Sequence, residues 1–418
     1  MRDSWENLTI DDIVEDISDG GTPPRTDSEN FGGSIPWVVI DDIKSEIYTT
    51  KEYLSEKGFK NCSSKLWPIN TLILSTGATI GEVGLAKVPL TTKQGIAGIK
   101  LKEIIDIDYA YYIFLSLKNE IQRLSQGSTI QEIRPKYLKQ IGVKITNNKL
   151  QQRKIASILS TCDQVIEKTE AAIAKYQALK QGMMHDLFTR GIDVNTGKLR
   201  ASYQDAPELY KESELGMIPK EWEKCTFKDI SSVNQGLQIP ISLRHKTEGV
   251  NRFVYITIQY LNDIENEANR YYIENPTTSV VCNEDDVLMV RTGNTGMIVT
   301  NIVGAFHNNF FKIDYGKNVV KEFLVYHLKR KSIQSIILNY AGTTTIPDLK
   351  HGDFYNLPFM MPSQIEQKII STRLDGIDNK LQTEQSALAK YQQLKAGLMQ
   401  DLLTGKVEVS VAEEILKN

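Results

Sequence analysis

The most regular pattern of apolar and polar positions in the chain occurs twice. In residues 149–191, apolar side chains recur at alternating steps of four and three, and residues 364–406 repeat these steps. The two stretches align without a gap and are identical at 16 of 43 positions. A sustained heptad pattern predicts a long helix whose apolar seam pairs with another helix. The chain is therefore expected to be a tandem duplication in which each half ends in such a helix.

The seam residues define the predicted pairing surface of the two helices. They include Ile155, Leu159, Ile166, Ile173, Tyr176, Lys180 and Leu187 in the first helix, and Leu374, Leu381, Glu384, Leu388, Tyr391, Lys395 and Leu402 in the second. About 40 helical residues span roughly 60 Å. Such helices could hold two modules at a fixed separation, or they could simply join the two halves.

Polar residues interrupt the seam at matching places, and they indicate how the helices pair. These residues are Thr169 and Lys180 in the first copy, and Glu384 and Lys395 in the second. Parallel pairing would place the two lysines against each other. Antiparallel pairing can place Lys180 opposite Glu384 and Thr169 opposite Lys395, which avoids the repulsion. We therefore predict an antiparallel intramolecular coiled coil with pseudo-twofold symmetry.

The segments that precede the two helices also repeat one another. Short apolar runs such as 35–40 and 71–75 predict strands, residues 106–125 have helical spacing, and glycine-rich loops separate these elements. Trp222 matches Trp5, the stretch 292–295 matches 76–79, and 342–346 matches 127–130. The fold class predicted is α+β, with two mixed α/β modules in tandem.

The repeat and the changes in composition predict six segments. They are a first module at 1–148, a helical region at 149–191, a linker at 192–218, a second module at 219–362, a second helical region at 363–407 and a tail at 408–418. The linker is predicted because its charges and glycines are scattered without apolar periodicity.

Composition excludes several classes of protein. The apolar runs are too short to cross a bilayer, and the polar start of the chain lacks the features of a signal peptide, so a cytoplasmic protein without a membrane contact is expected. The four cysteines are dispersed, which argues against a zinc site. The net charge of −3 does not suggest general affinity for nucleic acid. Any DNA specificity must therefore come from local loops.

The order of several motifs resembles the specificity subunits of type I restriction–modification systems. The motifs are Trp5 with 20–23 and 35–37, the strand and loop at 75–77, the stretch 214–222, and the helical stretches 179–184, 366–368 and 394–406. The resemblance covers nearly the whole chain in the order module, helix, module, helix. One departure is Gln151-Gln152-Arg153, which stands where 366–368 reads Glu-Gln-Lys.

The resemblance implies a non-catalytic subunit that reads a bipartite, asymmetric site in double-stranded DNA. Each module would read one half of the site, and the helices would set the gap between the halves. The resemblance also implies two modification subunits as partners, which carry S-adenosylmethionine and methylate adenine, with restriction subunits as optional further members. This chain itself would hold no cofactor.

Base edges in the major groove are read by basic, amide and hydroxyl side chains on rigid loops. By loop position, the candidates for DNA contact are Arg25, Thr76, Thr79, Lys93 and Gln94 in the first half, and Gln238, Arg244, Arg291, Thr292, Asn294, Thr295, His307, Asn308 and Asn309 in the second. Each of them could instead be a solvated or turn-forming side chain.

Two alternatives remain beside a DNA-reading subunit. One is an enzyme, since Asn356-Leu357-Pro358-Phe359 is similar to a methyltransferase motif, and Pro347-Asp348 with 366–368 is similar to a nuclease pattern. Both motifs are incomplete, so neither a catalytic residue nor a metal ligand is assigned. The other is a structural adaptor, a coiled coil whose two modules bind proteins.

Overall fold

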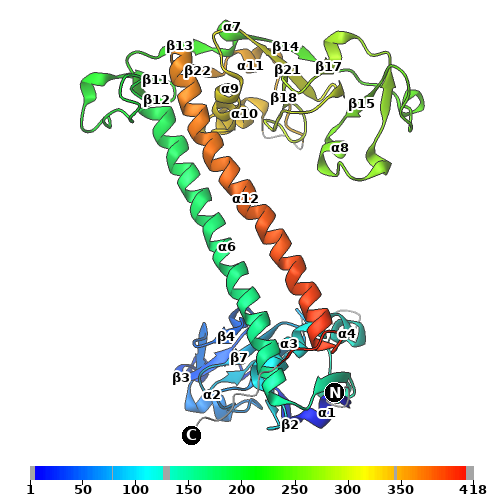
Figure 1. The fold of residues 1–418 in the computed structure, drawn as a ribbon. Coiled ribbons are helices and arrows are strands. Elements are labelled where there is room, and N and C mark those ends of the chain that lie inside the picture. The colour runs from blue at the N-terminus through cyan, green and yellow to red at the C-terminus, as the bar shows by residue number, and fades with distance from the viewer. Residues whose placement is uncertain (1–4, 78, 126–131, 343–345, 411–418) are drawn as a thin grey trace. The chain divides into compact units, whose positions relative to one another are not determined.

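The structure is a computed structural model, and it describes residues 5–77, 79–125, 132–342 and 346–410. It divides into two compact units. The first unit comprises Met1–Ala172 and Gln385–Asn418, and the second comprises Ile173–Glu384. The two long helices, α6 (Lys149–Thr189) and α12 (Gln364–Leu403), each contribute to both units (Figure 1). The predicted loops at 126–129 and 343–345 lie outside the described residues.

Within its described residues, the first unit places three small sheets and five short helices around its share of α6 and α12. In chain order its elements are β1 (Trp5–Thr9), α1 (Ile10–Ile13), β2 (Val14–Asp19), β3 (Phe31–Val38), β4 (Glu46–Ile47), β5 (Glu52–Leu54), α2 (Glu56–Lys60), β6 (Leu72–Ser75), β7 (Val83–Ala86), β8 (Thr91–Thr92), β9 (Ile96–Leu101), α3 (Ile107–Ser116), α4 (Lys118–Leu124), α5 (Pro135–Leu138) and β10 (Gly142–Thr146). The sheet orders are β1-β10, β2-β9-β6-β7-β4 and β5-β3-β8.

The second unit repeats this arrangement after an additional hairpin. Its elements are β11 (Tyr210–Ser213), β12 (Gly216–Pro219), β13 (Glu223–Thr226), α7 (Phe227–Ile230), β14 (Ser231–Gln235), β15 (Arg252–Ile256), α8 (Ile258–Asn262), β16 (Tyr272–Glu274), β17 (Val281–Cys282), β18 (Val287–Val290), β19 (Ile298–Val299), β20 (Gly304–Phe306), β21 (Phe310–Tyr315), α9 (Lys321–Lys329), α10 (Lys331–Ala341), α11 (His351–Tyr355) and β22 (Pro358–Met361). The sheet orders are β11-β12, β13-β22, β14-β21-β18-β19 and β16-β15-β20-β17.

The two long helices run antiparallel in each unit, as predicted. In the first unit, the core contains Ile155 and Leu159 from the start of α6 together with Leu402 from the end of α12. In the second, it contains Leu187 from the end of α6 together with Ile370 from the start of α12. None of the predicted seam residues is exposed in either helix. The mixed α/β class and the antiparallel pairing are therefore confirmed.

The predicted partners of the seam lysines are wrong. Lys180 pairs with Asp378 at 2.5 Å rather than with Glu384, and Lys395 pairs with Asp163 rather than lying opposite Thr169. The reason lies outside the seam, because a tyrosine hydroxyl also donates to each aspartate. Tyr112 donates to Asp163 at 2.7 Å and Tyr326 donates to Asp378 at 2.9 Å.

Two buried glutamines fasten the modules to the helices. The Gln152 amide accepts from Asp106 N at 2.6 Å and donates to Ile104 O at 3.2 Å and to Thr146 O at 2.8 Å. The Gln367 amide repeats this pattern, since it accepts from Val320 N at 2.8 Å and donates to Asn318 O at 3.0 Å and Pro362 O at 2.9 Å. Both side chains are fully buried, so each amide replaces the water that these backbone groups would otherwise bind.

The segment predicted as a linker is an ordered part of the second unit. Ile192 is fully buried, and its backbone N–H donates to Glu366 Oε1 at 2.7 Å. Arg200 forms an ion pair with the buried Glu366 at 2.6 Å. Hydrophobic periodicity could not reveal this order, because polar contacts with the start of α12 and a short hairpin provide it.

Replacing Gln367 by Leu should leave Val320 N, Asn318 O and Pro362 O without partners. We expect the variant to lose about 2 to 4 kcal/mol of unfolding free energy, because buried unsatisfied polar groups are costly. Urea denaturation monitored by circular dichroism measures this loss. The neighbouring exposed Lys368→Ala should stay within about 0.5 kcal/mol of the parent. Equal stability of Q367L and K368A would contradict the role of the glutamine.

His327 should make the second unit sensitive to acid. It is fully buried, burial lowers its pKa to about 3, and its Nδ1 has no hydrogen-bond partner. Between about pH 6.5 and 3 the unfolded chain therefore binds a proton at this site that the folded chain does not. Stability should fall as the pH drops below about 6.5.

In the first unit, Ile113 follows Tyr112 as His327 follows Tyr326, so His327→Ile is the matched replacement. We expect this variant to be less stable at pH 7.5, because Pro358 O loses its partner at 2.9 Å. Its thermal midpoint should nevertheless fall less between pH 7.5 and 5 than that of the parent. The same fall in both proteins would exclude His327 as the source.

Candidate nucleic-acid interface

An aromatic side chain supports the glycine loop that follows β2 in the first unit. Gly20 N donates to Ile96 O and Gly21 N donates to Thr92 O, both at 3.0 Å. The indole of the buried Trp37, at the end of β3, donates to Gly21 O at 3.1 Å. A Cβ on Gly20 would lie 2.1 Å from Thr92 O, so the close approach of these two backbone segments requires glycine.

The second unit builds the same framework from different residues. Gly236 N donates to Phe310 O at 3.3 Å, and the hydroxyl of the buried Tyr255 donates to Leu237 O at 2.7 Å. A Cβ on Gly236 would lie 2.2 Å from Phe306 O. Tyr255 therefore takes the place of Trp37, and the glycine loops of the two units correspond to each other.

Two side chains lie close to each aromatic ring. One comes from the segment after the glycine loop, and the other is the residue that follows the parallel neighbouring strand, β8 or β20. In the first unit, Arg25 and Lys93 lie 5.3 and 6.0 Å from the Trp37 ring. In the second, Arg244 lies 4.9 Å from the Tyr255 ring, and the ring of His307 lies 5.7 Å from it. Lys93 N donates to Val38 O at 3.0 Å as His307 N donates to Ile256 O at 2.9 Å, so these two residues occupy equivalent positions.

A pocket opens beside each aromatic platform. In the first unit its volume is about 470 Å³, and its lining includes Lys93, Gln94 and Glu132. In the second unit its volume is about 480 Å³, and its lining is Ile241, Arg244, Thr257, Ile258, Gln259, Ala268, Asn269, Tyr271, His307 and Asn309. The structure thus brings Lys93 together with Gln94, and Arg244 together with His307 and Asn309, as a binding site requires.

The charges of the two platforms differ. Arg25 is tied to Glu52 by two hydrogen bonds of 2.8 and 3.0 Å, so its charge is compensated. Arg244 instead donates its Nε to Ile239 O at 2.9 Å and lies against Tyr255 and Tyr271. Desolvation, and next the charge of Arg244, lower the pKa of His307 below its usual value. His307 is therefore mainly neutral at pH 7; its Nδ1 accepts from Asn309 N at 3.2 Å, which leaves Nε2–H to donate to a ligand.

Several other candidates serve the fold. Thr76 is fully buried and donates to Asp19 at 2.9 Å. Thr295 is buried and donates to Pro347 O at 2.8 Å. Asp348 accepts from Arg291 at 2.9 Å and from Thr292 at 2.5 Å. These four residues hold their loops together and are withdrawn as proposed base readers.

The remaining candidates are spread over the loops. Thr79 and Asn294 are exposed in the turns that follow β6 and β18. Gln238 is also exposed, and its amide accepts from Asn308 at 3.3 Å. The buried Oδ1 of Asn308 has no partner. These residues remain proposals for DNA contact.

The predicted match of the two halves in this region is shifted by one residue. Thr76 N donates to Gly95 O at 2.9 Å, and the equivalent bond in the second unit runs from Arg291 N to Asn309 O at 2.7 Å. Thr76 therefore corresponds to Arg291 rather than to Thr292. The Thr-Gly pair that both halves contain gave the wrong alignment. The backbone hydrogen bonds define which residues are equivalent, and residue identity alone does not.

Sequence reasoning missed the aromatic platforms and several polar lining residues of the two pockets, among them Glu132 and Gln259. Trp37 was noted only as part of a strand, and Tyr255, Glu132 and Gln259 were not selected. Aligning the halves on Gly20 and Gly236 would have found the platforms, because both glycines precede an aromatic strand end.

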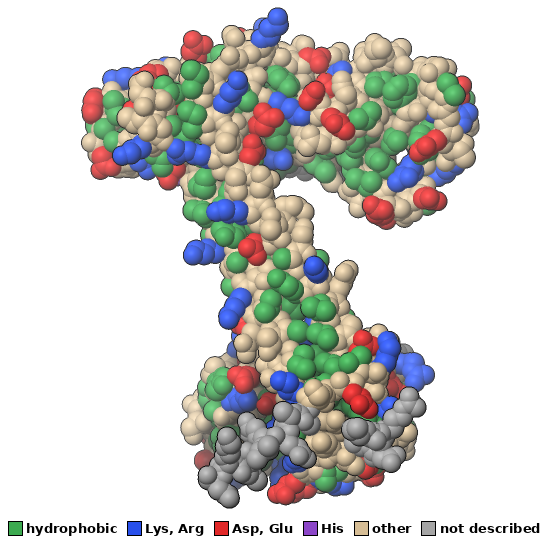
Figure 2. All heavy atoms as spheres, viewed as in Figure 1, with side chains coloured by type: hydrophobic (Ala, Val, Ile, Leu, Met, Phe, Trp, Pro, Cys, Tyr) green, Lys and Arg blue, Asp and Glu red, His purple; other side chains and the backbone are tan. Residues whose placement is uncertain are grey.

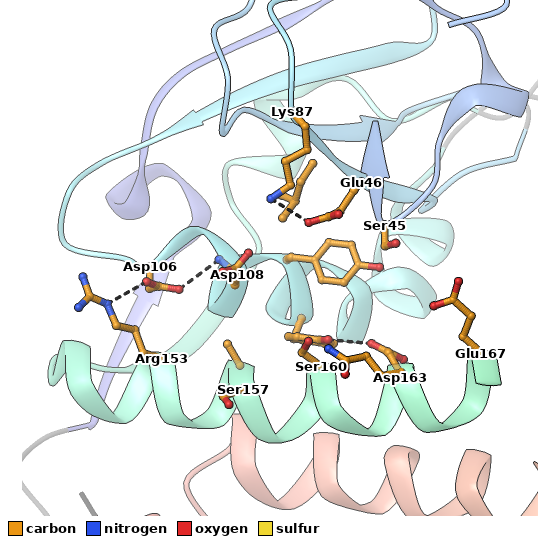
Figure 3. Close-up of a pocket in the computed structure, with 15 residues that line it drawn as sticks. Ser45, Glu46, Lys87, Asp106, Asp108, Arg153, Ser157, Ser160, Asp163 and Glu167 are labelled. Carbon is orange, nitrogen blue, oxygen red and sulfur yellow. Dashed lines mark hydrogen bonds and ion pairs between the residues drawn. The ribbon is translucent and has the colours of Figure 1, made fainter. Parts of the chain in front are cut away.

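A further pocket of about 540 Å³ in the first unit has another chemistry (Figure 3). Glu46, Asp108, Asp163 and Glu167 face it from several elements, and only some of these acids are paired, as in Lys87–Glu46 at 3.0 Å. Burial raises the pKa of Asp108. An acidic pocket repels phosphate, so it is not a DNA site. Acidic and basic side chains are also intermixed on the visible faces of the units (Figure 2).

The two enzyme motifs have structural explanations. Asp348 is held by Arg291 and Thr292, and Glu366 is held by Arg200, so neither carboxylate is free. Leu357 and Phe359 are fully buried where the chain enters β22, which makes the stretch 356–359 the start of a strand. Within the described residues, no group of three or more His, Cys, Asp or Glu side chains could hold a metal. None of the helices there could span a membrane either.

Two equivalent loop platforms with different side chains define a protein with two related ligand-reading modules. A family model described as "Type I restriction modification DNA specificity domain" matches residues 2–175 and again 219–394. The chain belongs to this family and carries its domain twice. It is thus a DNA-specificity subunit of a type I restriction–modification system and is not itself the catalytic subunit, as predicted. The adaptor and enzyme alternatives are not supported.

Relatives of known class match nearly the whole chain. The MjaIX specificity subunit of Methanocaldococcus jannaschii is 26% identical over 97% of this chain and 94% of its own length. The MjaVIII specificity subunit of the same organism is 23% identical over 98% and 94%. The solved S subunit of M. genitalium has a TM-score of 0.60 at 19% identity over 97% of both chains, which shows the same fold.

Arg291→Ala should destabilise the second unit rather than change only its ligand preference. The side chain of Arg291 is 15% exposed, and its guanidinium lies 5.3 Å from the Phe311 ring and donates to Asp348 and to Leu349 O. We expect a loss of about 1 to 3 kcal/mol in a thermal or urea melt. Arg244→Ala, which removes the same charge beside the pocket, should cost less than about 1 kcal/mol. A larger loss in Arg244→Ala would reverse these assignments.

Proposed function

We propose that each aromatic platform with its pocket reads one half of a bipartite DNA site. The supporting observation is the repetition of one framework with different side chains at its reading positions. Gly20 and Gly236, and Trp37 and Tyr255, keep the loops in the same place. At the equivalent reading position stands Lys93 in one unit and His307 in the other.

The chemistry of the pockets fits base edges. A lysine ammonium suits the O6 and N7 acceptors of guanine, while amides suit adenine and Glu132 could accept from the amino group of cytosine. A neutral His307 beside Asn309 and Gln259 offers both donors and acceptors. The different lining in the two halves supports two different half-sites and so an asymmetric site as a whole.

We further propose that the chain works within a complex. It would recruit two modification subunits, which bind S-adenosylmethionine and methylate adenine, and restriction subunits would join them for cleavage. The net charge of −3 supports this, because tight DNA binding by one chain alone usually needs a basic excess. A solved relative with a TM-score of 0.56 and 14% identity comes from work entitled in part "complex assembly" of "the type I R-M system". The two long helices would set the gap between the half-sites.

Lys93→Ala should alter recognition of one half-site, and His307→Ala should alter recognition of the other. Long-read mapping of methylated adenines first defines the bipartite motif in cells that carry the parent complex. Binding of the assembled complex to duplexes with one half altered then measures each variant. A lost base contact costs about 1 to 3 kcal/mol of discrimination, or roughly 5- to 150-fold.

The matched control is Lys60→Ala, an exposed lysine of the first unit away from the pocket. It should lower affinity little and leave the motif unchanged. If K93A and H307A both keep the parent discrimination at every position, the platforms are not the reading sites. A motif without two separated parts would contradict the proposed function itself.

A further inference from the structure

A second kind of pocket lies in the second unit, at the junction of α6 with α9 and α10. Its volume is about 440 Å³, and Lys180, His185, Lys329, Arg330 and Lys331 contribute to its lining. The lining contains no carboxylate. It shares no residue with the DNA-reading pocket of the same unit. None of its basic residues was selected as a base reader.

The positive charge of this pocket is only partly compensated. Lys180 is paired with Asp378 and lies 5.6 Å from the Tyr326 ring. Arg330 lies 4.9 Å from the Phe188 ring, but its buried Nη1 has no hydrogen-bond partner. Burial lowers the pKa of Arg330 to about 10. Arg330 is half-buried as a whole, but its buried Nη1 lacks a partner, and an anion in the pocket would supply one.

The start of α10 adds to the attraction for an anion. This helix begins at Lys331 directly after Arg330, has no acidic residue in its first turn and has no side-chain cap. Its free N–H groups and its dipole therefore also favour negative charge at this end. The cluster of cations, the orphaned Nη1 and the uncapped helix start all point to the same ligand chemistry.

Among the described residues, the first unit carries fewer unpaired basic side chains at the equivalent place. Tyr112 corresponds to Tyr326, since each hydroxyl donates to the matching aspartate of a long helix. By this register Leu115 stands where the second unit has Lys329, and the single residue between the two helices is Leu117 in the first unit and Arg330 in the second. Lys118 begins α4 as Lys331 begins α10, but Lys118 is paired with Glu82 at 2.7 Å. The cationic pocket therefore distinguishes two halves that are otherwise built alike.

We infer that this pocket binds an acidic side chain of an assembling protein subunit. The pocket would thereby distinguish the second unit from the first. Met184 and Tyr326 provide apolar lining for the stem of an acidic side chain, and the volume of about 440 Å³ leaves room for the residues next to it in the partner. A DNA backbone is a broad ridge that is contacted from exposed loops, and this pocket belongs to the helices instead. The identity of the subunit rests on the proposed function, in which modification subunits dock to this chain.

The first experiment probes the pocket without any partner. Isothermal titration of the purified full chain with inorganic phosphate, at fixed ionic strength, should detect binding to the parent and to Lys175→Gln. Lys175 is an exposed lysine of α6 outside the pocket, so its replacement removes the same charge. Binding should be lost in Arg330→Gln and in the double variant Lys329→Gln/Lys331→Gln. The double variant retains the contact of Arg330 with Phe188 and guards against loss of folding.

The second experiment measures assembly with the modification subunit and DNA binding by the complex. We expect both pocket variants to weaken assembly at least tenfold, K175Q to leave it unchanged, and the motif to stay the same. Absence of phosphate binding by the parent, or unchanged assembly in both variants, would overturn the inference. So would weaker DNA binding at full assembly, which would assign the pocket to DNA. If the parent itself does not assemble with a modification subunit, the proposed function fails, and the phosphate titration still decides whether the pocket binds anions.

Discussion

The fold depends on two buried amides that join each module to a long helix. Gln152 and Gln367 sit near the first turns of α6 and α12, and each bonds three backbone groups, two of them in the module chain that leads into α3 or α9. A flexible joint would let the reading loops turn freely against the helix. These hydrogen bonds, made away from water, fix that angle within each unit. Loop recognition then rests on a rigid support.

The same division between fixed and variable parts continues into the loops. At Gly20 and Gly236, two segments of the backbone lie too close together for any side chain. The buried Trp37 and Tyr255 each donate to the carbonyl of the residue that follows the glycine. The side chains that project over these rings are free to differ, because their backbone is held by bonds that do not involve them. Lys93 and His307 show the result, since they share a backbone position and offer different chemistry. One framework can therefore present two specificities.

Much of this organisation could be predicted from the sequence, because it follows from periodicity. The seam residues from Ile155 to Leu187 predicted a paired helix, and the polar interruptions predicted its antiparallel direction. The ion-pair partners could not be predicted, because Asp163 and Asp378 are chosen by hydroxyls of Tyr112 and Tyr326, which belong to the modules. The choice of base-reading residues from loop position was limited for a similar reason. Thr76 and Arg291 have the composition of base readers, but burial and Asp348 assign them to the support.

The departures from the internal repeat show where the two units have separate tasks. Duplication produces two equal units. A partner protein that meets two equal units cannot distinguish one from the other. Several residues that support the fold agree between the copies, as with Gln152 and Gln367 or Lys180 and Lys395. Ile113 and Leu117 stand where the second unit has His327 and Arg330, and here the copies disagree. His327 is fully buried, and the buried Nη1 of Arg330 has no partner. Such groups reduce stability unless something binds them. The unpaired Arg330 is therefore better explained by a ligand than by packing, whereas His327, enclosed by Phe359 and Phe188 and bonded to Pro358 O, is explained by packing alone.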